Sequence, residues 1–142
     1  MQGECRCGRV QIRVTRPPLV TSACHCRGCQ RMSSSAFSLT GIFPSDGFEV
    51  TRGEPVIGGL HGADAHFFCA YCMTWLFTRP QVAPQIVNVR STMFDDATWS
   101  APFIETFTKT QLPWAITGAV HSFEEFPPMS AFEGLVKAFA SQ

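Results

Sequence analysis

The sequence lacks the features that would direct it to nucleic acid or to a membrane. No run of basic residues exceeds two, and 11 basic residues balance 11 acidic ones, so the formal net charge is zero. Nucleic acids and anionic membranes attract basic patches, so we expect neither as a partner. No apolar run approaches a membrane span of 18 residues, and the first ten residues lack the basic and apolar regions of a signal peptide. These absences predict a cytoplasmic protein.

Familiar catalytic patterns are missing as well. The chain has no Ser-His-Asp pattern, no paired carboxylates and no glycine-rich phosphate loop. It does not lack apolar material, because hydrophobic residues make up 45% of its 142 positions and include 13 phenylalanines. A chain of this length buries roughly 68–70% of the surface that it would expose when unfolded, which is enough for one core. With no repeat, low-complexity segment or linker in view, we expect a single domain over residues 1–142.

Up to residue 128 the sequence reads as short strands separated by turn signals. Val10, Ile12 and Val14 alternate with polar neighbours, which is typical of a half-buried strand. Segments 48–52 and 55–60, separated by Gly53, suggest a hairpin. Further strands are expected at residues 19–23, 36–43, 65–69, 74–78 and 84–90. The pattern predicts a mainly β, antiparallel fold.

The last segment, residues 129–142, has the period of a helix. Its apolar residues share one helical face: Phe132, Leu135, Val136 and Phe139. Ser130 and Glu133 have the spacing of a capping box at its start. We therefore expect a short C-terminal helix that covers the sheet or an oligomer partner, and this apolar face would suit a homodimer.

Cysteine is the residue from which most of the chemistry can be inferred. Seven cysteines are an odd number, and a core of this size in a reducing compartment needs no disulfide framework. They are clustered, not scattered, as Cys5 with Cys7, as Cys24, Cys26 and Cys29, and as Cys69 with Cys72. A tight CxC or CxxC turn brings two sulfurs toward one ion, so the clusters predict zinc binding.

Spacing alone permits two ways of sharing ions among these cysteines. A zinc-ribbon pairing would use two CxxC turns, which are Cys26 with Cys29 and Cys69 with Cys72. The alternative uses all seven, as a closed group of four and a separate group of three. Structural zinc sites are closed and catalytic ones keep an open position, which fits the four-plus-three arrangement. From the spacing, both assignments stay open.

The order CxCG, CHCxxCQR, AFS and CxxC resembles the glutathione-dependent formaldehyde-activating enzyme family, which includes relatives of centromere protein V. The matching stretches are "CRCGRV", "ACHCRGCQRMSSSAFS", "RGEP" and "HFFCAYCMTWLF", and "FTKTQLPWAI" with "FEEFP" is similar to the family's carboxy-terminal ending. The chain departs from the family at Met73, where glycine is common. The resemblance implies a β-tent of stacked antiparallel sheets organised around zinc.

The resemblance also implies two zinc ions per chain and a reaction. It places a structural zinc on four cysteines and a catalytic zinc on three: Cys5, Cys7, Cys69 and Cys72, and Cys24, Cys26 and Cys29. The family's named reaction joins glutathione to formaldehyde and is classed with the carbon–sulfur lyases. Three thiolates make zinc a weak Lewis acid that suits a thiolate as fourth ligand, so we expect a small thiol and an aldehyde as substrates.

Two other functions stay open. The chain could be a non-catalytic, zinc-stabilised β binding module, or a redox or metal-buffering protein that uses its CxCxxC cluster as reactive thiols. Near that cluster, His25 is expected to point away from the metal and to pack. Arg27 and Arg31 could meet carboxylates of a thiol substrate, and Gln30 could orient a ligand. Trp114 is a weak candidate for lining a pocket.

Overall fold

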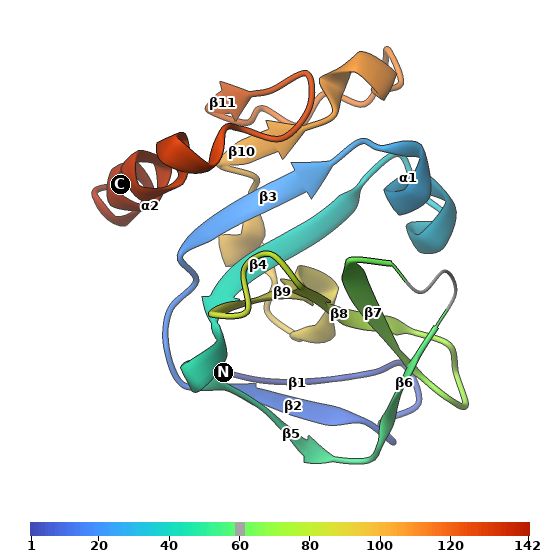
Figure 1. Ribbon diagram of the computed structural model, residues 1–142. Coiled ribbons are helices and arrows are strands. Elements are labelled where there is room, and N and C mark those ends of the chain that lie inside the picture. The colour runs from blue at the N-terminus through green and yellow to red at the C-terminus, as the bar shows by residue number, and fades with distance from the viewer. Residues whose placement is uncertain (59–61) are drawn as a thin grey trace. The chain divides into compact units, whose positions relative to one another are not determined.

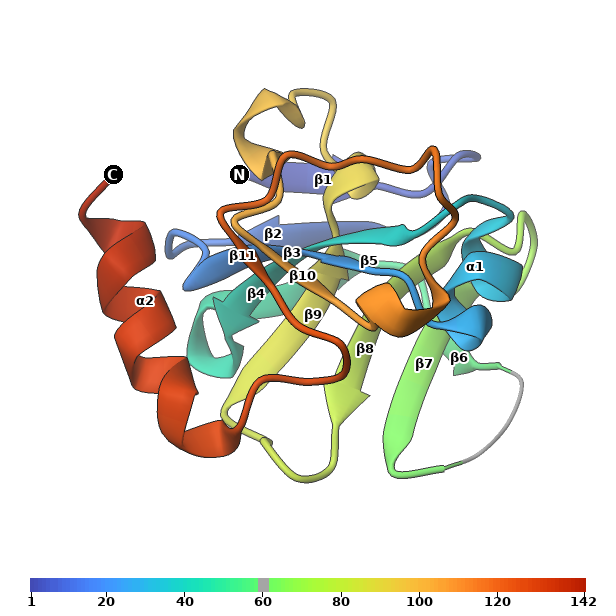
Figure 2. The same ribbon diagram turned by 90° about the horizontal axis from the view of Figure 1, so that it is seen from above.

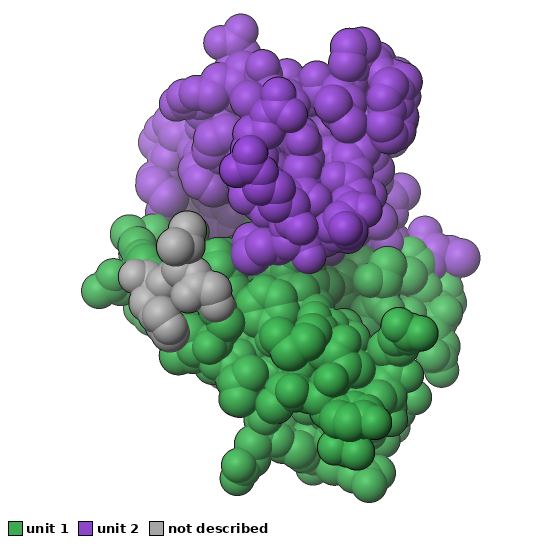
Figure 3. All heavy atoms as spheres, turned by 90° about the vertical axis from the view of Figure 1, so that its right-hand side faces the viewer, with its two compact units in different colours: residues 1–18, 42–97 green, residues 19–41, 98–142 purple. Residues whose placement is uncertain are grey.

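The computed structural model describes residues 1–58 and 62–142 (Figure 1). These residues form two compact units, each assembled from distant parts of the chain (Figure 3). Unit 1 contains residues 1–18 and 42–97, and unit 2 contains residues 19–41 and 98–142. Strand β4 (Ser38–Pro44) begins in unit 2 and ends in unit 1. The single domain expected over residues 1–142 stays a prediction.

The first sheet of unit 1 is antiparallel, with the strand order β1-β2-β5. Its strands are β1 (Gln2–Glu4), β2 (Gln11–Val14) and β5 (Phe48–Arg52). In β2, Ile12 and Val14 are buried while Arg13 between them is exposed, so the predicted alternation is confirmed. Such alternation is expected where one face of a sheet is covered and the other is solvated.

The second set of strands in unit 1 is also antiparallel and runs in the order β9-β8-β7-β6. Its members are β6 (Pro55–Ile57), β7 (Asp64–Cys69), β8 (Trp75–Pro80) and β9 (Ile86–Arg90). The Phe77 ring stacks on Phe67 at 4.7 Å and meets Phe48 of β5 edge-on at 4.8 Å. Aromatic packing therefore joins this set to the three-stranded sheet.

The expected hairpin between segments 48–52 and 55–60 is wrong, and residues 59 and 60 lie outside the described residues. Strand β5 pairs with β2, whereas β6 pairs with β7. Gly53 separates them with a φ of 80°, and a Cβ there would clash with the carbonyl oxygen of Arg9. This left-handed turn sends the chain into another sheet, which two strand-like segments beside a glycine could not reveal.

Unit 2 contains parallel strands that the sequence pattern did not predict. Strand β10 (Ile104–Thr106) pairs in parallel with both β3 (Val20–Cys24) and β11 (His121–Ser122). Parallel neighbours need long connections, and β3 and β10 come from distant parts of the sequence, so no local turn signal marks them. The predicted class is nevertheless confirmed: the chain is mainly β, with antiparallel and mixed sheets and a short C-terminal helix.

Two helices lie at opposite ends of unit 2, α1 (Arg27–Ser33) and α2 (Phe132–Ala140) (Figures 1 and 2). Short 3₁₀ turns occur at Ser45–Gly47, Ser91–Met93, Thr98–Ser100, Thr108–Thr110 and Met129–Ala131. None of the described helices is long and apolar enough to cross a membrane.

The predicted C-terminal helix is confirmed as α2, and it packs against β3. Leu135 is buried, and the Phe139 ring lies edge-on to Phe103 with 5.4 Å between centroids. The capping-box prediction is wrong, because Ala131 is the N-cap and makes no side-chain cap bond. A 3₁₀ turn runs directly into the helix and includes Ser130, so that side chain does not stand at the cap. A homodimer stays a prediction.

Replacing Gly53 with alanine should lower the free energy of unfolding by at least about 1–2 kcal/mol, because Ala at a positive φ is strained and its Cβ would meet Arg9. The matched control is Gly134→Ala in α2, where an added Cβ has no neighbour within 4 Å. Alanine favours a helix interior, so this control should stabilise by about 1 kcal/mol. Urea unfolding measures both, and a neutral Gly53→Ala would contradict the expectation.

Candidate metal centres

Four cysteine sulfurs of unit 1 form one compact group, made of Cys5, Cys7, Cys69 and Cys72. All four Sγ atoms lie within 4.8 Å of one another. The Sγ of Cys7 is 3.5 Å from that of Cys5 and 3.8 Å from that of Cys69. Four sulfurs this close match the donor set of a closed, tetrahedral metal site.

The second pair in this group stands on a tight turn between β7 and β8. The Cys72 N–H donates to the Cys69 Sγ at 3.5 Å, and the Met73 N–H donates to the Cys69 carbonyl at 3.0 Å. Met73 has a φ of 58°, a conformation that glycine adopts without strain and most side chains resist. The chain therefore makes this turn with a residue other than glycine, at a conformational cost.

Within this group the pKa of one thiol is lowered and that of another is raised. Burial raises the pKa of the Cys72 thiol, but hydrogen bonds, chiefly those from Thr74, lower it to about 5. The Arg9 backbone lowers the pKa of Cys7, but burial and the neighbouring cysteine thiols raise it to about 11. Adjacent thiols cannot all ionise because their thiolates repel. A cation removes that repulsion, so the donor set fits a metal ion.

Three cysteine sulfurs of unit 2 form the second group, and they also lie within 4.8 Å of one another. Cys24 ends β3, Cys26 is the N-cap of α1, and Cys29 lies in the first helical turn. The Cys29 N–H donates to the Cys26 Sγ at 3.3 Å. Sequence reasoning missed this short helix. The structure groups the cysteines as four and three, and their metal binding stays a prediction.

The three-cysteine group also pairs one acidic thiol with a resistant neighbour. A hydrogen bond from Cys29 lowers the pKa of Cys24 to about 5, against the opposing effect of burial, and the Thr106 hydroxyl adds to the lowering. The same contact with Cys24 raises the pKa of Cys29. One thiolate forms readily and a second does not, so this donor set also fits a positively charged ion.

His25 stands between two of these cysteines in the sequence and is fully buried, as expected for a packing residue. Its Nε2 lies 2.9 Å from Oε2 of Glu105, which is 80 positions away in the sequence. Sequence reasoning missed Glu105. The signal available was an acid in the apolar run Phe103-Ile104-Glu105, where a charge needs partners if it is buried.

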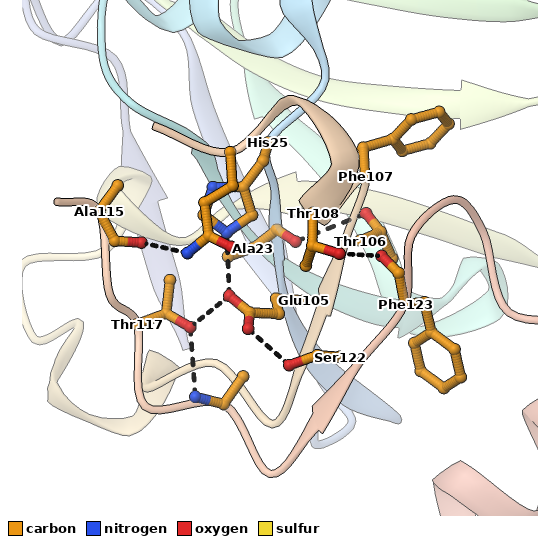
Figure 4. A network of polar contacts seen from close by, with 12 residues as sticks. Ala23, His25, Glu105, Thr106, Phe107, Thr108, Ala115, Thr117, Ser122 and Phe123 are labelled. Atoms are coloured by element: carbon orange, nitrogen blue, oxygen red, sulfur yellow. Dashed lines mark hydrogen bonds and ion pairs between the residues drawn. The ribbon is translucent and has the colours of Figure 1, made fainter. Parts of the chain in front are cut away.

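Glu105 is buried with partners for both carboxylate oxygens (Figure 4). The Thr117 hydroxyl lies 2.8 Å from Oε2, and the Ser122 hydroxyl lies 2.6 Å from Oε1. Burial raises the pKa of Glu105, but these hydroxyls and His25 lower it below its usual range. The ionised carboxylate accepts hydrogen bonds from His25, Thr117 and Ser122. These three hydrogen bonds favour the charged form of Glu105.

Of the three α1 residues considered in the sequence analysis, Gln30 makes strong hydrogen bonds, whereas Arg27 and Arg31 face solvent. The Gln30 Nε2 donates to the carbonyl oxygen of His25 at 2.7 Å, so Gln30 holds the cysteine loop. Arg27 and Arg31 are exposed, and the Arg27 Nη1 donates weakly to the Gln30 Oε1 at 3.4 Å. Trp114 is 73% exposed, so the structure shows it on the surface of unit 2.

The chain is a mainly β protein with two cysteine groups that could hold metal ions. Residues 1–110 match the sequence model of the family described as glutathione-dependent formaldehyde-activating enzyme, and the chain belongs to that family. No curated protein sequence matches it significantly. A crystal structure of a Rhodobacter sphaeroides protein is similar, with a TM-score of 0.57 and 21% identity over 67% of this chain and 88% of that chain. This likeness shows the fold alone.

Replacing Met73 with glycine should raise the free energy of unfolding by about 1 kcal/mol, since relief of the left-handed strain outweighs the added chain entropy. The Met73 side chain is 61% exposed, so little packing is lost. Ala70→Gly is the control in the same turn, without a positive φ, and should destabilise. Thermal unfolding of the purified protein compares them, and a destabilised Met73→Gly would count against the strain.

Glu105→Gln should reduce the acid sensitivity of the fold. A lowered carboxyl pKa stabilises the folded state above the unfolded value of about 4.3, and this contribution disappears as pH falls through the folded pKa. The variant should cost roughly 1–2 kcal/mol at pH 7, because charged hydrogen bonds become neutral ones. That difference from wild type should shrink between pH 5 and pH 3 in urea titrations. Glu124→Gln, an exposed control, should show no such trend.

Proposed function

We propose that this chain is a zinc-dependent carbon–sulfur lyase, or synthase in the reverse direction, acting on a glutathione-like thiol and an aldehyde such as formaldehyde. The observation that carries the proposal is the group of three sulfurs within 4.8 Å in unit 2. Three protein ligands leave one position of a tetrahedral site for a substrate. Membership of the formaldehyde-activating family supports the choice of thiol and aldehyde.

We assign two zinc ions per chain, one to each group of cysteines. The structural ion would be held by Cys5, Cys7, Cys69 and Cys72, and the catalytic ion by Cys24, Cys26 and Cys29. Zinc in the open site would keep a bound substrate thiol deprotonated, and the thiolate is the nucleophilic form of sulfur. In the overall reaction a carbon–sulfur bond forms at the carbonyl carbon, and the carbonyl oxygen takes up the proton that the thiol lost.

The chain's own residues would contribute position and charge. Cys26 accepts from the Cys29 N–H at 3.3 Å, so the helix start fixes two of the three sulfurs relative to each other. Arg27 and Arg31 are exposed and one helical turn apart, so both can face the same approaching molecule. We assign them to the carboxylates of the thiol substrate, because guanidinium groups bind carboxylates in paired hydrogen bonds.

A second candidate function, a non-catalytic β binding module, is favoured by one exposed segment of unit 2, residues 114–120. Trp114, Ile116 and Val120 are 73%, 78% and 61% exposed, respectively. Exposed apolar side chains that gather in one segment are typical of binding surfaces. An enzyme and a module of this kind differ in whether the three-cysteine ion takes part in turnover, which the following variants test.

Native mass spectrometry of the purified protein should find two zinc ions per chain, and Cys29→Ser should hold one. The same variant should slow exchange between a thiol and its hydroxymethyl adduct, followed by NMR with glutathione and formaldehyde, by at least about 100-fold. Ser35→Ala, an exposed change just after α1, is the control and should match wild type.

The counts and rates together separate the candidate functions. Two ions with exchange no faster than in buffer would favour the binding module over the enzyme. One ion in the wild-type protein would contradict the assignment of a catalytic zinc. Arg27→Ala with Arg31→Ala should raise KM for glutathione and leave exchange with a thiol lacking carboxylates unchanged, since the arginines act on charge alone.

A further inference from the structure

The residue between Cys24 and Cys26 is anchored by its side chain. His25 has no exposed surface, and its Nε2 lies 2.9 Å from Oε2 of Glu105 (Figure 4). Its ring meets Phe37 edge-on, with 5.3 Å between centroids. Because both neighbours of His25 are cysteines of the open group, a ring held in one place restricts where both sulfurs can lie.

The backbone of His25 is anchored as firmly as its ring. Its N–H donates to the Thr106 carbonyl at 3.0 Å. Its carbonyl oxygen accepts from the Gln30 amide at 2.7 Å and from the Thr110 hydroxyl at 3.0 Å. Phe107, with a φ of 58°, turns the chain between β10 and the 3₁₀ turn that contains Thr110. A left-handed aromatic residue at this point costs energy and persists only where surrounding contacts require it.

Glu105 can hold the ring because its carboxylate is itself held. The hydroxyls of Thr117 and Ser122 donate to its two oxygens at 2.8 Å and 2.6 Å, and the three residues lie together in Figure 4. In turn, the Thr117 hydroxyl accepts from the Ala119 N–H at 3.2 Å. The contacts thus run from the loop after β10, through one carboxylate, to the cysteine loop.

Strand register explains why Glu105 supports the cysteine loop without occupying the cysteine group itself. In the parallel pair of β3 and β10, Glu105 stands opposite Ala23, and Thr106 stands opposite Cys24. Successive side chains of a strand point to opposite faces of the sheet. Thr106 therefore lies on the same face as Cys24, and Glu105 lies on the opposite face with Ala23. Glu105 therefore acts from the face opposite the sulfur of Cys24.

From this arrangement we infer that Glu105 is a positioning residue that holds the His25 ring and so sets Cys24 and Cys26 at ion-binding separation. The inference rests on the proposed function, because it takes the three-cysteine group to hold zinc. A loop already in place loses less conformational freedom when the ion arrives. Replacing a residue that orients metal ligands without itself binding the ion typically lowers metal affinity 10–100-fold.

The test compares Glu105→Asp with Glu105→Gln in the zinc-loaded full chain. Aspartate keeps the charge but is one methylene too short to reach His25 while it keeps its hydroxyl partners. Glutamine keeps the reach and an acceptor oxygen but loses the charge. We expect Glu105→Asp to lose one zinc at 10–100-fold lower chelator concentration than wild type, while Glu105→Gln stays within a few-fold. Native mass spectrometry counts the ions that stay bound.

Cadmium-113 NMR of the cadmium-loaded protein shows which cysteine group has lost its ion, because a group of three sulfurs and a group of four give separate resonances. The three-sulfur resonance should shift or broaden in Glu105→Asp, and the four-sulfur resonance of unit 1 should not. Glu124→Asp, an exposed carboxylate of unit 2, is the matched control and should leave both unchanged. A residue that merely stabilised the fold would weaken both groups alike.

Three results would overturn the inference: Glu105→Asp binding both ions like wild type, both ions weakening equally, or Glu105→Gln losing its ion as readily as Glu105→Asp. If neither variant folds, Ser122→Ala decides, because loss of one hydroxyl should still selectively weaken the three-cysteine ion. A wild-type chain that holds one ion would overturn the proposed function. Two ions with an unchanged Glu105→Asp would overturn this inference alone.

Discussion

The repulsion between crowded thiolates is the constraint on which the rest of this structure depends. In both groups the sulfurs lie within 4.8 Å, and in each group one thiol has a pKa of about 5 while a neighbour resists ionisation. Bringing sulfurs together this way is unfavourable until a cation neutralises them. The turns and strand ends that carry the cysteines therefore bring together two groups of sulfurs that could hold metal ions.

Both cysteine groups contain a CxxC turn with the same hydrogen bond, but the turns are followed by different secondary structure. Each CxxC turn has an N–H that donates to the sulfur of its first cysteine, at 3.3 Å in unit 2 and 3.5 Å in unit 1. In unit 1 the turn leads through Met73 into a strand, and the CxC segment near the amino terminus adds two sulfurs. In unit 2 the turn becomes a helix, and Cys24 alone joins it. The closed or open character of each group follows from what the opposing segment contributes.

Local periodicity could be read correctly, but the choice of strand partner could not. The alternation around Ile12 and the apolar face that includes Leu135 were both recognisable, since each depends on the next few residues. The hairpin after β5 was wrong because Gly53 turns the chain into another sheet. The parallel pairing of β10 has no local signal, so Glu105 could not be placed beside His25 from the sequence.

By itself, the sequence determined the mainly β class, the C-terminal helix, the seven candidate ligands and the resemblance to one family. Its spacing left two groupings of the cysteines, and the resemblance favoured one of them. Only the tertiary structure decided that Cys26 caps a helix, that Met73 adopts a left-handed turn and that Glu105 holds His25. The physical reason is that spacing and periodicity describe neighbours along the chain, whereas the support of a site comes from residues brought together by strand pairing.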